Sequence, residues 1–184
     1  MGLNETPAAG RVHIGFFGRR NAGKSSLVNA VTGQDLAVVS EVKGTTTDPV
    51  SKAMELLPLG PVLIIDTPGF DDDAGLLGEE RVRRARRVLN KTDVAILVVD
   101  AAVGLTETDE ELLALFRAKE VSYLVVFNKS DLLAGRPTDE PGSIHVSAAT
   151  GARIEELKEK IAALAAGRET KLKIVGDLIS PSDF

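Results

Sequence analysis

Short apolar runs alternate along this chain with stretches in which apolar residues recur every three or four positions. The runs predict strands and the spaced patterns predict helices, because side chains repeat every two residues in a strand and about every 3.6 in a helix. The predicted strands cover residues 12–17, 52–57, 62–65, 94–99, 123–127 and 143–146. The predicted helices cover residues 24–32, 79–90, 107–119 and 154–165. This alternation predicts an α/β fold with a mostly parallel sheet of about six strands and helices on both faces.

Turn and cap signals add detail to this arrangement. Only Pro58-Leu59-Gly60-Pro61 separates the second and third strands, so they predict a hairpin and one antiparallel edge strand. Thr106 and Asp109 predict a capping box at the start of the third helix. Beyond Gly167 the pattern becomes short and β-rich, and it predicts no continuation of the last helix. The expected organisation is an N-terminal extension (1–10), one globular domain (11–167) and a connector toward a following domain (168–184).

Composition narrows the class of protein. A hydrophobic content of 43% and a charged content of 27% are typical of a globular domain. The net charge of −5 disfavours a general nucleic-acid or anionic-membrane binder, so neither is expected as a partner. The chain has no cysteine, which excludes disulfides and thiolate metal sites within it. Because no apolar run reaches the length of a membrane span and no signal-peptide core is seen, we expect a cytoplasmic location.

The segment Gly18-Arg19-Arg20-Asn21-Ala22-Gly23-Lys24-Ser25 fits the pattern G-x-x-x-x-G-K-S between a predicted strand and a predicted helix. In this context the pattern predicts a phosphate-binding loop, since backbone N–H groups at a helix N-terminus attract anions. Lys24 is expected to reach the outer phosphates of a nucleoside triphosphate and Ser25 to ligate its Mg²⁺. The residues expected to contact the nucleotide here are Arg20, Asn21, Ala22, Gly23, Lys24, Ser25 and Ser26.

A second motif, Asn128-Lys129-Ser130-Asp131, follows a predicted strand and indicates which base is bound. The Asp131 carboxylate could accept hydrogen bonds from the N1–H and the exocyclic amine of guanine. Adenine lacks the N1 proton and would leave a polar group unpaired, which such sites reject strongly. The stems of Asn128 and Lys129 are expected to sandwich the base. A backbone N–H of the turn Ser147-Ala148-Ala149 is expected to contact the guanine oxygen.

Two further segments are expected to sense the third phosphate. Asp66-Thr67-Pro68-Gly69 ends a predicted strand; Asp66 would hold Mg²⁺ through a water, and the Gly69 N–H would meet the γ-phosphate. The polar segment 34–48 contains Thr45 and Thr46, and a threonine there can close over Mg²⁺ when GTP is bound. We expect Thr46 to be the ligand, with Thr45 as the alternative.

With these motifs in chain order, residues 12–164 resemble the small-GTPase superfamily. The resemblance implies a Ras-like P-loop fold, binding of GTP and GDP, and Mg²⁺-dependent hydrolysis of GTP. Phe70 stands where Ras-like proteins carry the glutamine that orients the attacking water, and it cannot hydrogen-bond to water. Either the chain is a slow nucleotide-state switch, or another group assists hydrolysis. The residues with expected catalytic roles are Lys24, Asn21, Thr46 and Gly69.

Asn21 is a candidate for that assistance. Asparagine at this position resembles the potassium-activated GTPases, among them the tRNA-modification and Era-like families. The resemblance implies that the Asn21 side-chain oxygen coordinates K⁺ where other GTPases receive an arginine finger. The resemblance therefore gives two expected metal sites, with Ser25, Thr46 and Asp66 for Mg²⁺ and Asn21 for K⁺.

A closer resemblance concerns the opening residues 1–7, the phosphate loop, the segment 44–50 and the acidic run 71–73. Together they resemble the maturation GTPases of iron-only (FeFe) hydrogenase, HydF. Thr47 stands where the tRNA-modification and Era-like families usually carry arginine. The resemblance implies a dimerisation domain and an iron–sulfur cluster domain in the full protein, with other maturases and apo-hydrogenase as partners. The isolated domain is expected to be a monomer. The alternative is the GTPase domain of a tRNA-modification or ribosome-assembly protein.

Overall fold

A computed structural model of the chain describes residues 11–19, 22–33, 50–66, 78–135 and 137–178. Its strands are β1 (Val12–Gly18), β2 (Val50–Leu56), β3 (Gly60–Asp66), β4 (Val94–Asp100), β5 (Ser122–Asn128) and β6 (Ser143–His145). Its helices are α1 (Lys24–Thr32), α2 (Gly78–Leu89), α3 (Glu107–Ala118) and α4 (Ile154–Leu178), with a short 3-10 helix, η5 (Ser130–Leu132). Each predicted strand and helix is present, and most boundaries differ from the prediction by one or two residues.

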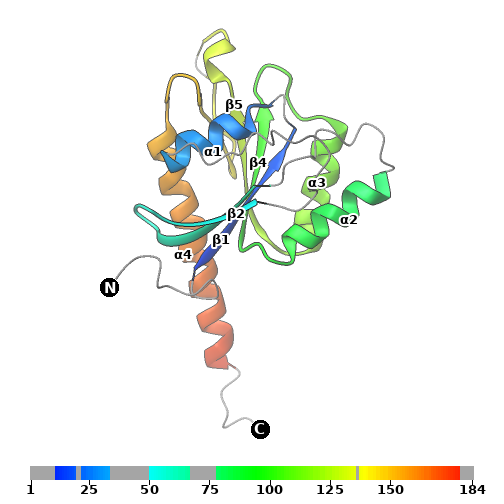
Figure 1. Ribbon diagram of the computed structural model, residues 1–184, viewed down its shortest axis with the longest axis vertical. Helices are drawn as coiled ribbons and strands as arrows, with labels where there is room; N and C mark the ends of the chain where they lie inside the picture. The colour runs from blue at the N-terminus through cyan, green and yellow to red at the C-terminus, as the bar shows by residue number, and fades with distance from the viewer. Residues whose placement is uncertain (1–10, 20–21, 34–49, 67–77, 136, 179–184) are drawn as a thin grey trace.

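The six described strands form one sheet in the order β2-β3-β1-β4-β5-β6 (Figure 1). β2 pairs antiparallel with β3, and the other neighbouring pairs are parallel. The predicted edge hairpin and mixed, mostly parallel sheet are therefore confirmed. Because the parallel strands end at the same edge, the segments that follow β1, β3, β4, β5 and β6 are brought together there. This edge is where ligands bind in open α/β sheets.

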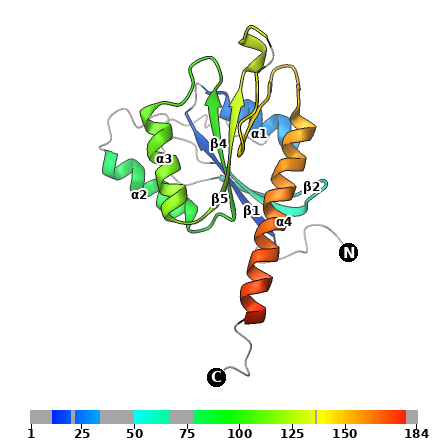
Figure 2. The ribbon, with the colours of Figure 1, turned by 180° about the vertical axis from the view of Figure 1, so that it is seen from behind.

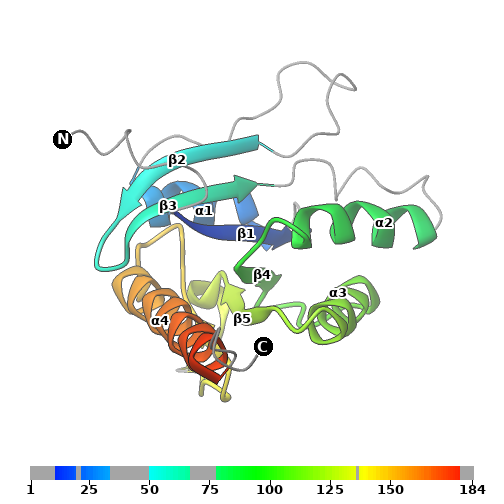
Figure 3. The same ribbon diagram turned by 90° about the horizontal axis from the view of Figure 1, so that it is seen from below.

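Two layers of helices cover the sheet, α1 and α4 on one face and α2 and α3 on the other (Figures 1 and 3). β4 shows how the sequence produces both cores. Its even-numbered residues from 94 to 98 pack in the cluster with α1 and α4, and its odd-numbered residues from 95 to 99 pack with α2 and α3. Such a strand is buried on both sides, so it appears in the sequence as a continuous apolar run. This central strand holds the sheet edge in place between the two cores.

The start of α3 has the predicted capping box. The Thr106 hydroxyl accepts a hydrogen bond from the Asp109 N–H (3.3 Å), and Asp109 Oδ2 accepts one from the Thr106 N–H (2.9 Å). The two side chains thus satisfy two backbone donors that the first turn of a helix would otherwise leave unpaired. The box fixes where the β4–α3 loop ends and orients the Asp109 side chain.

The prediction that the last helix ends before the β-rich segment is wrong, because α4 continues to Leu178. Its distal part extends beyond the sheet (Figure 2). Gly167 costs a helix only about 1 kcal/mol relative to alanine, too little to stop a helix already nucleated by packing. Leu172, Val175 and Leu178 also recur at helical spacing after it. No helix in the described part of the chain combines the length and apolar character needed to cross a membrane.

Candidate nucleotide-binding site

The phosphate loop, residues 18–25, connects β1 to α1 at the sheet edge. Gly18 has a φ of +134°, and a Cβ there would clash with the Val98 carbonyl of β4. Gly23, at the N-cap of α1, has a φ of +80°, and a Cβ there would lie 2.6 Å from Asn128 Nδ2. Both motif glycines are thus required by backbone conformation and by close approach. Arg20 and Asn21 lie outside the described residues.

Lys24 and Asp66 meet at the phosphate end of the site. Lys24 is 3% exposed, and its Nζ lies 3.3 Å from Asp66 Oδ1. The geometry of this ion pair is not that of a hydrogen bond, so Asp66 Oδ1 is a buried oxygen that accepts no hydrogen bond from any described residue. The first residue of α1 and the last residue of β3, 42 positions apart in the chain, supply this pair.

The same residues fit Mg²⁺. A buried carboxylate oxygen without a hydrogen-bond donor is a suitable hard ligand, and Ser25 presents an exposed hydroxyl in the first turn of α1. Within the described residues no three His, Cys, Asp or Glu side chains gather into a metal cage. Few protein ligands together with substrate phosphates are the usual environment of Mg²⁺. The other predicted sensors of the third phosphate, Thr45, Thr46 and Gly69, lie outside the described residues, as does Phe70.

Asn128, the last residue of β5, joins the phosphate loop to the loop that follows β6. Its Nδ2 donates to the Ala22 carbonyl (2.9 Å), and its Oδ1 accepts from the Ala148 N–H (2.9 Å). The side chain is buried; its bond to Ala22 is protected from water, and its bond to Ala148 is protected in part. Sequence reasoning placed Asn128 against the base and missed this bridge. The predicted sandwich by its stem remains a prediction.

Lys129 and Asp100 support the phosphate loop from the adjacent strand end. Lys129 has a left-handed backbone (φ 65°), and its Nζ contacts Asp100 Oδ2 at 3.2 Å. Although burial raises the pKa of Asp100, hydrogen bonds from the Ala102 N–H and from Lys129 outweigh it and lower that pKa below its usual value. Asp100 is therefore a charged anchor that holds Lys129 beside Gly23. Sequence reasoning did not single out Asp100. The signal that could have found it is a carboxylate directly after the apolar run 94–99.

At the other end of the site, Asp131 is held by the loop after β6. The buried Ser147 hydroxyl donates to Asp131 Oδ1 (2.7 Å). Asp131 is itself exposed, and its Oδ2 has no hydrogen-bond partner among the residues that the structure describes. One carboxylate oxygen is thus fixed and the other can face a ligand. Sequence reasoning assigned Ser147 to the base but missed its bond to Asp131.

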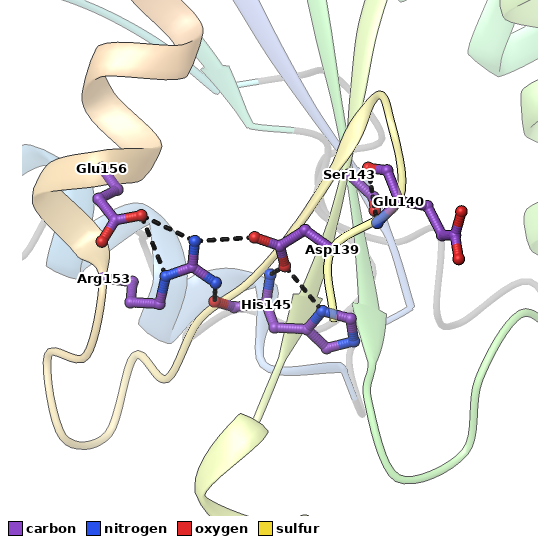
Figure 4. A network of polar contacts seen from close by, with 6 residues as sticks. All are labelled: Asp139, Glu140, Ser143, His145, Arg153 and Glu156. Carbon is purple, nitrogen blue, oxygen red and sulfur yellow. Dashed lines mark hydrogen bonds and ion pairs between the residues drawn. The ribbon is translucent and has the colours of Figure 1, made fainter. Parts of the chain in front are cut away.

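A network of polar contacts fixes the segment we call the base loop, residues 147–152 (Figure 4). Arg153 Nη2 lies 2.7 Å from Asp139 Oδ2 and 2.7 Å from Glu156 Oε2. Asp139 Oδ1 in turn accepts from the His145 N–H at 2.9 Å. The Arg153 guanidinium holds the pKa of Asp139 well below its usual range, against the opposing effect of burial. The network ties β6 to the start of α4, and the base loop lies between them.

Comparison with known proteins identifies the family. Residues 13–129 match the family described as 50S ribosome-binding GTPase. The chain belongs to this family. The tRNA modification GTPase MnmE of Nitratidesulfovibrio vulgaris is 40% identical over 150 residues, which are 79% of this chain and 32% of that protein. GTPase Der of Wolinella succinogenes is 34% identical over 174 residues, which are 86% of this chain and 36% of that protein. The chain spans about a third of the length of these relatives.

Solved structures give the same assignment for this GTPase domain. Era in complex with MgGDPNP and a segment of 16S ribosomal RNA has a TM-score of 0.67 and 25% identity, over 83% of this chain and 56% of Era. An Aquifex aeolicus Era variant bound to GDP and AlF4⁻ has a TM-score of 0.67 and 26% identity, with the same coverage of 83% and 56%. The predicted Ras-like fold is confirmed, and the chain is a P-loop GTPase domain of the Era, MnmE and Der type.

Proposed function

We propose that this domain binds GTP with Mg²⁺ and hydrolyses it to GDP and phosphate, with K⁺ stimulation, within a scaffold that assembles the FeFe-hydrogenase active site. The observation that carries the nucleotide part is the Asn128 bridge between the phosphate loop and the base loop. It supports a single site with the Lys24–Asp66 pair at one end and Asp131 at the other.

In this proposal Lys24 exchanges partners when the nucleotide binds. Its ammonium, paired with Asp66 in the described structure, turns to the outer phosphates, which carry more charge than one carboxylate. Ser25 and Thr46 would hold Mg²⁺ directly and Asp66 would hold it through a water; the ion would supply positive charge beside the transferred phosphoryl group. The Gly69 N–H meets the γ-phosphate, so the switch segments respond to its loss.

Base recognition is tested by Asp131→Asn, which replaces a double acceptor by a group with one acceptor and one donor. We expect the variant to lose affinity for GDP and to gain relative affinity for xanthosine diphosphate, whose base carries an additional oxygen. Calorimetric titration with both nucleotides measures the ratio. Asp93→Asn is the matched control, because Asp93 precedes β4 at the opposite end of the sheet, where it accepts from the His13 N–H. An unchanged nucleotide preference in Asp131→Asn would exclude this account of base recognition.

Potassium stimulation is tested by steady-state GTP hydrolysis in KCl and in NaCl at matched ionic strength. A bound cation near the transferred phosphoryl group would supply part of the roughly 10³–10⁵-fold acceleration that an arginine finger provides. We expect faster turnover in KCl, and loss of the difference in Asn21→Ala with GDP affinity retained. Equal slow rates in both salts would instead favour the slow nucleotide switch.

The role in hydrogenase maturation rests on the resemblance of residues 1–7, 44–50 and 71–73 to HydF. A second candidate is a tRNA-modification enzyme, which the 40% identity to MnmE favours. A domain exchange separates the two. This chain is substituted for the GTPase domain of HydF and, in parallel, for that of MnmE. We expect recovery of hydrogenase activation in the first hybrid alone; recovery of tRNA modification alone would reverse the assignment.

A further inference from the structure

A cavity of about 190 Å³ lies beside the phosphate loop, between the end of β4 and the start of α3. Arg19 and Ala22 of the loop line one side, and Asp109 of α3 lines another. Val98 and Val99 of β4 contribute apolar lining. The cavity is separate from the Lys24–Asp66 pair and from the base loop. A second carboxylate that lines it, Asp100, is already engaged by Lys129 at 3.2 Å.

Asp109 presents an unpaired acceptor in this cavity. The residue is 2% exposed, and its Oδ2 is engaged in the α3 cap, accepting from the Thr106 N–H (2.9 Å) and hydroxyl (3.0 Å). Its Oδ1 is buried and has no hydrogen-bond partner within the described part of the chain. A buried carboxylate oxygen left unpaired is unfavourable, and a charged donor that reaches it is strongly stabilised. Since the cap occupies Oδ2, Oδ1 is the oxygen that a group in the cavity would meet.

Arg19 carries the matching donor. It lines the same cavity and is exposed, and its side chain has no hydrogen-bond or ion-pair partner among the residues that the structure describes. Its guanidinium is always charged and presents several N–H groups in one plane, a geometry suited to a carboxylate. The aliphatic stem of an arginine can lie along apolar surface such as Val98 and Val99 while the head reaches a polar group.

We propose that this cavity is a receptor for the Arg19 guanidinium, and that Asp109, through Arg19, is a positioning residue for the phosphate loop. Gly18 fixes the loop against β4 before Arg19, and Asn128 fixes it at Ala22 after Arg19. The Arg19 carbonyl accepts from the Ala22 N–H at 3.0 Å, so holding Arg19 also holds this turn. The pair therefore links the loop that surrounds the phosphates to α3. The proposal rests on nucleotide binding by this loop and on neither K⁺ nor hydrogenase maturation.

The test measures dissociation of fluorescent GDP from wild type, Arg19→Ala, Asp109→Asn and the double variant. In Asp109→Asn the side-chain oxygen still accepts hydrogen bonds in the cap. The NH₂ group, a donor that cannot pair with arginine, then takes the place of Oδ1. A charge-assisted hydrogen bond predicts about tenfold faster dissociation in each single variant. We expect the double variant to be no faster than the singles, because both remove the same interaction. Effects that multiply in the double variant would overturn the proposal.

Chemical rescue distinguishes this pair from a general structural effect. Methylguanidinium should restore slow dissociation in Arg19→Ala, but not in the double variant, which lacks the carboxylate. It should have little effect on the wild type, where Arg19 fills the cavity; an equal effect on the wild type would overturn Arg19 as the occupant. Arg117→Ala, which removes an exposed arginine of α3, is the matched control for charge. Absence of rescue in Arg19→Ala also contradicts the proposal.

A second measurement does not depend on nucleotide affinity. The Arg19 Nε–H resonance should shift and become protected from solvent exchange when the guanidinium pairs with Asp109, and Asp109→Asn should abolish both changes. Thr106→Ala removes the hydroxyl of the cap and leaves Oδ1 in place. It should lower stability to urea while keeping the Arg19 resonance protected. If Thr106→Ala removed the protection as completely as Asp109→Asn, the effect would belong to the helix cap and not to the pair.

Discussion

The Asn128 side chain joins the two halves of the nucleotide site, and its removal should weaken nucleotide binding far more than its size suggests. Asn128→Ala deletes the bonds to the Ala22 carbonyl and the Ala148 N–H, both 2.9 Å long. Asn128 is 2% exposed; without it the Ala22 carbonyl loses its partner in a buried environment, and the Ala148 N–H loses its partner in a partly buried one. Each orphaned group costs about 1–3 kcal/mol, so the expected total is about 2–4 kcal/mol after partial rehydration.

This free energy should be seen mainly in the dissociation constant for GDP, because the two bonds hold the phosphate loop and the base loop in register. A loss of about 2–4 kcal/mol corresponds to a roughly 30- to 1,000-fold weaker Kd. Calorimetric titration or fluorescence anisotropy measures it, and urea unfolding without nucleotide separates binding from folding. Asn90→Ala, which removes an exposed contact to Lys119, is the control and should leave the Kd unchanged.

Asn128→Asp makes the test sharper. It keeps an oxygen for the Ala148 N–H but turns a second oxygen toward the Ala22 carbonyl, which Nδ2 faces at 2.9 Å in the native protein. Two acceptors at that distance repel, so aspartate should weaken GDP binding at least as much as alanine does. Retention of near-native affinity by either variant would refute the bridge as the link between the two loops.

Three further substitutions test the support of the site. Ser147→Ala releases Asp131 from its 2.7 Å hydrogen bond, so GDP binding should weaken about tenfold. The variant should also discriminate less against inosine diphosphate, whose base lacks the exocyclic amine; competition binding measures both changes. Arg153 lowers the pKa of Asp139 below its ordinary value of 3.8, so Asp139 stabilises the fold above that pH and loses this effect as the pH falls below it. Urea midpoints at pH 7 and pH 3 should therefore differ less in Asp139→Asn than in wild type; equal differences would contradict this. Gly18→Ala should destabilise the fold by about 2–5 kcal/mol, because alanine is strained at a φ of +134° and its Cβ would clash with β4. Thermal unfolding measures the loss, and a native-like midpoint would show that the turn can relax.

The sequence was sufficient where a local pattern determines the structure. α1 begins at Lys24 because a glycine-rich loop precedes an amphipathic segment, and the α3 cap follows from Thr106 and Asp109 alone. β2 and β3 could be paired because the segment between them is short. The phosphate and base motifs led to the two ends of the candidate site, and the nucleotide contacts assigned to their residues stay predictions.

Features that depend on distant contacts could not be predicted. Asp139 and Arg153 are separated by 14 positions and meet only because β6 and α4 pack as they do. The bond from Ser147 to Asp131 joins two loops across 16 positions, and no local pattern announces it. The end of α4 was misjudged for another reason. A β-rich composition is a weak preference, and a helix already packed on the sheet overrides it.

These supports have a common consequence for function. Asn128 and Lys129 follow one another at the end of β5. The Asn128 side chain bonds to Ala22 of the phosphate loop and to Ala148 of the base loop, and Lys129 is held by Asp100. A disturbance at one end of the site can therefore reach the other through this strand end. Because Asp131 depends on Ser147 of the base loop, and that loop is bonded to Asn128 through Ala148, base selectivity and phosphate affinity share their support. Variants that loosen the base loop should lose both properties together, whereas Asp131→Asn should lose selectivity first.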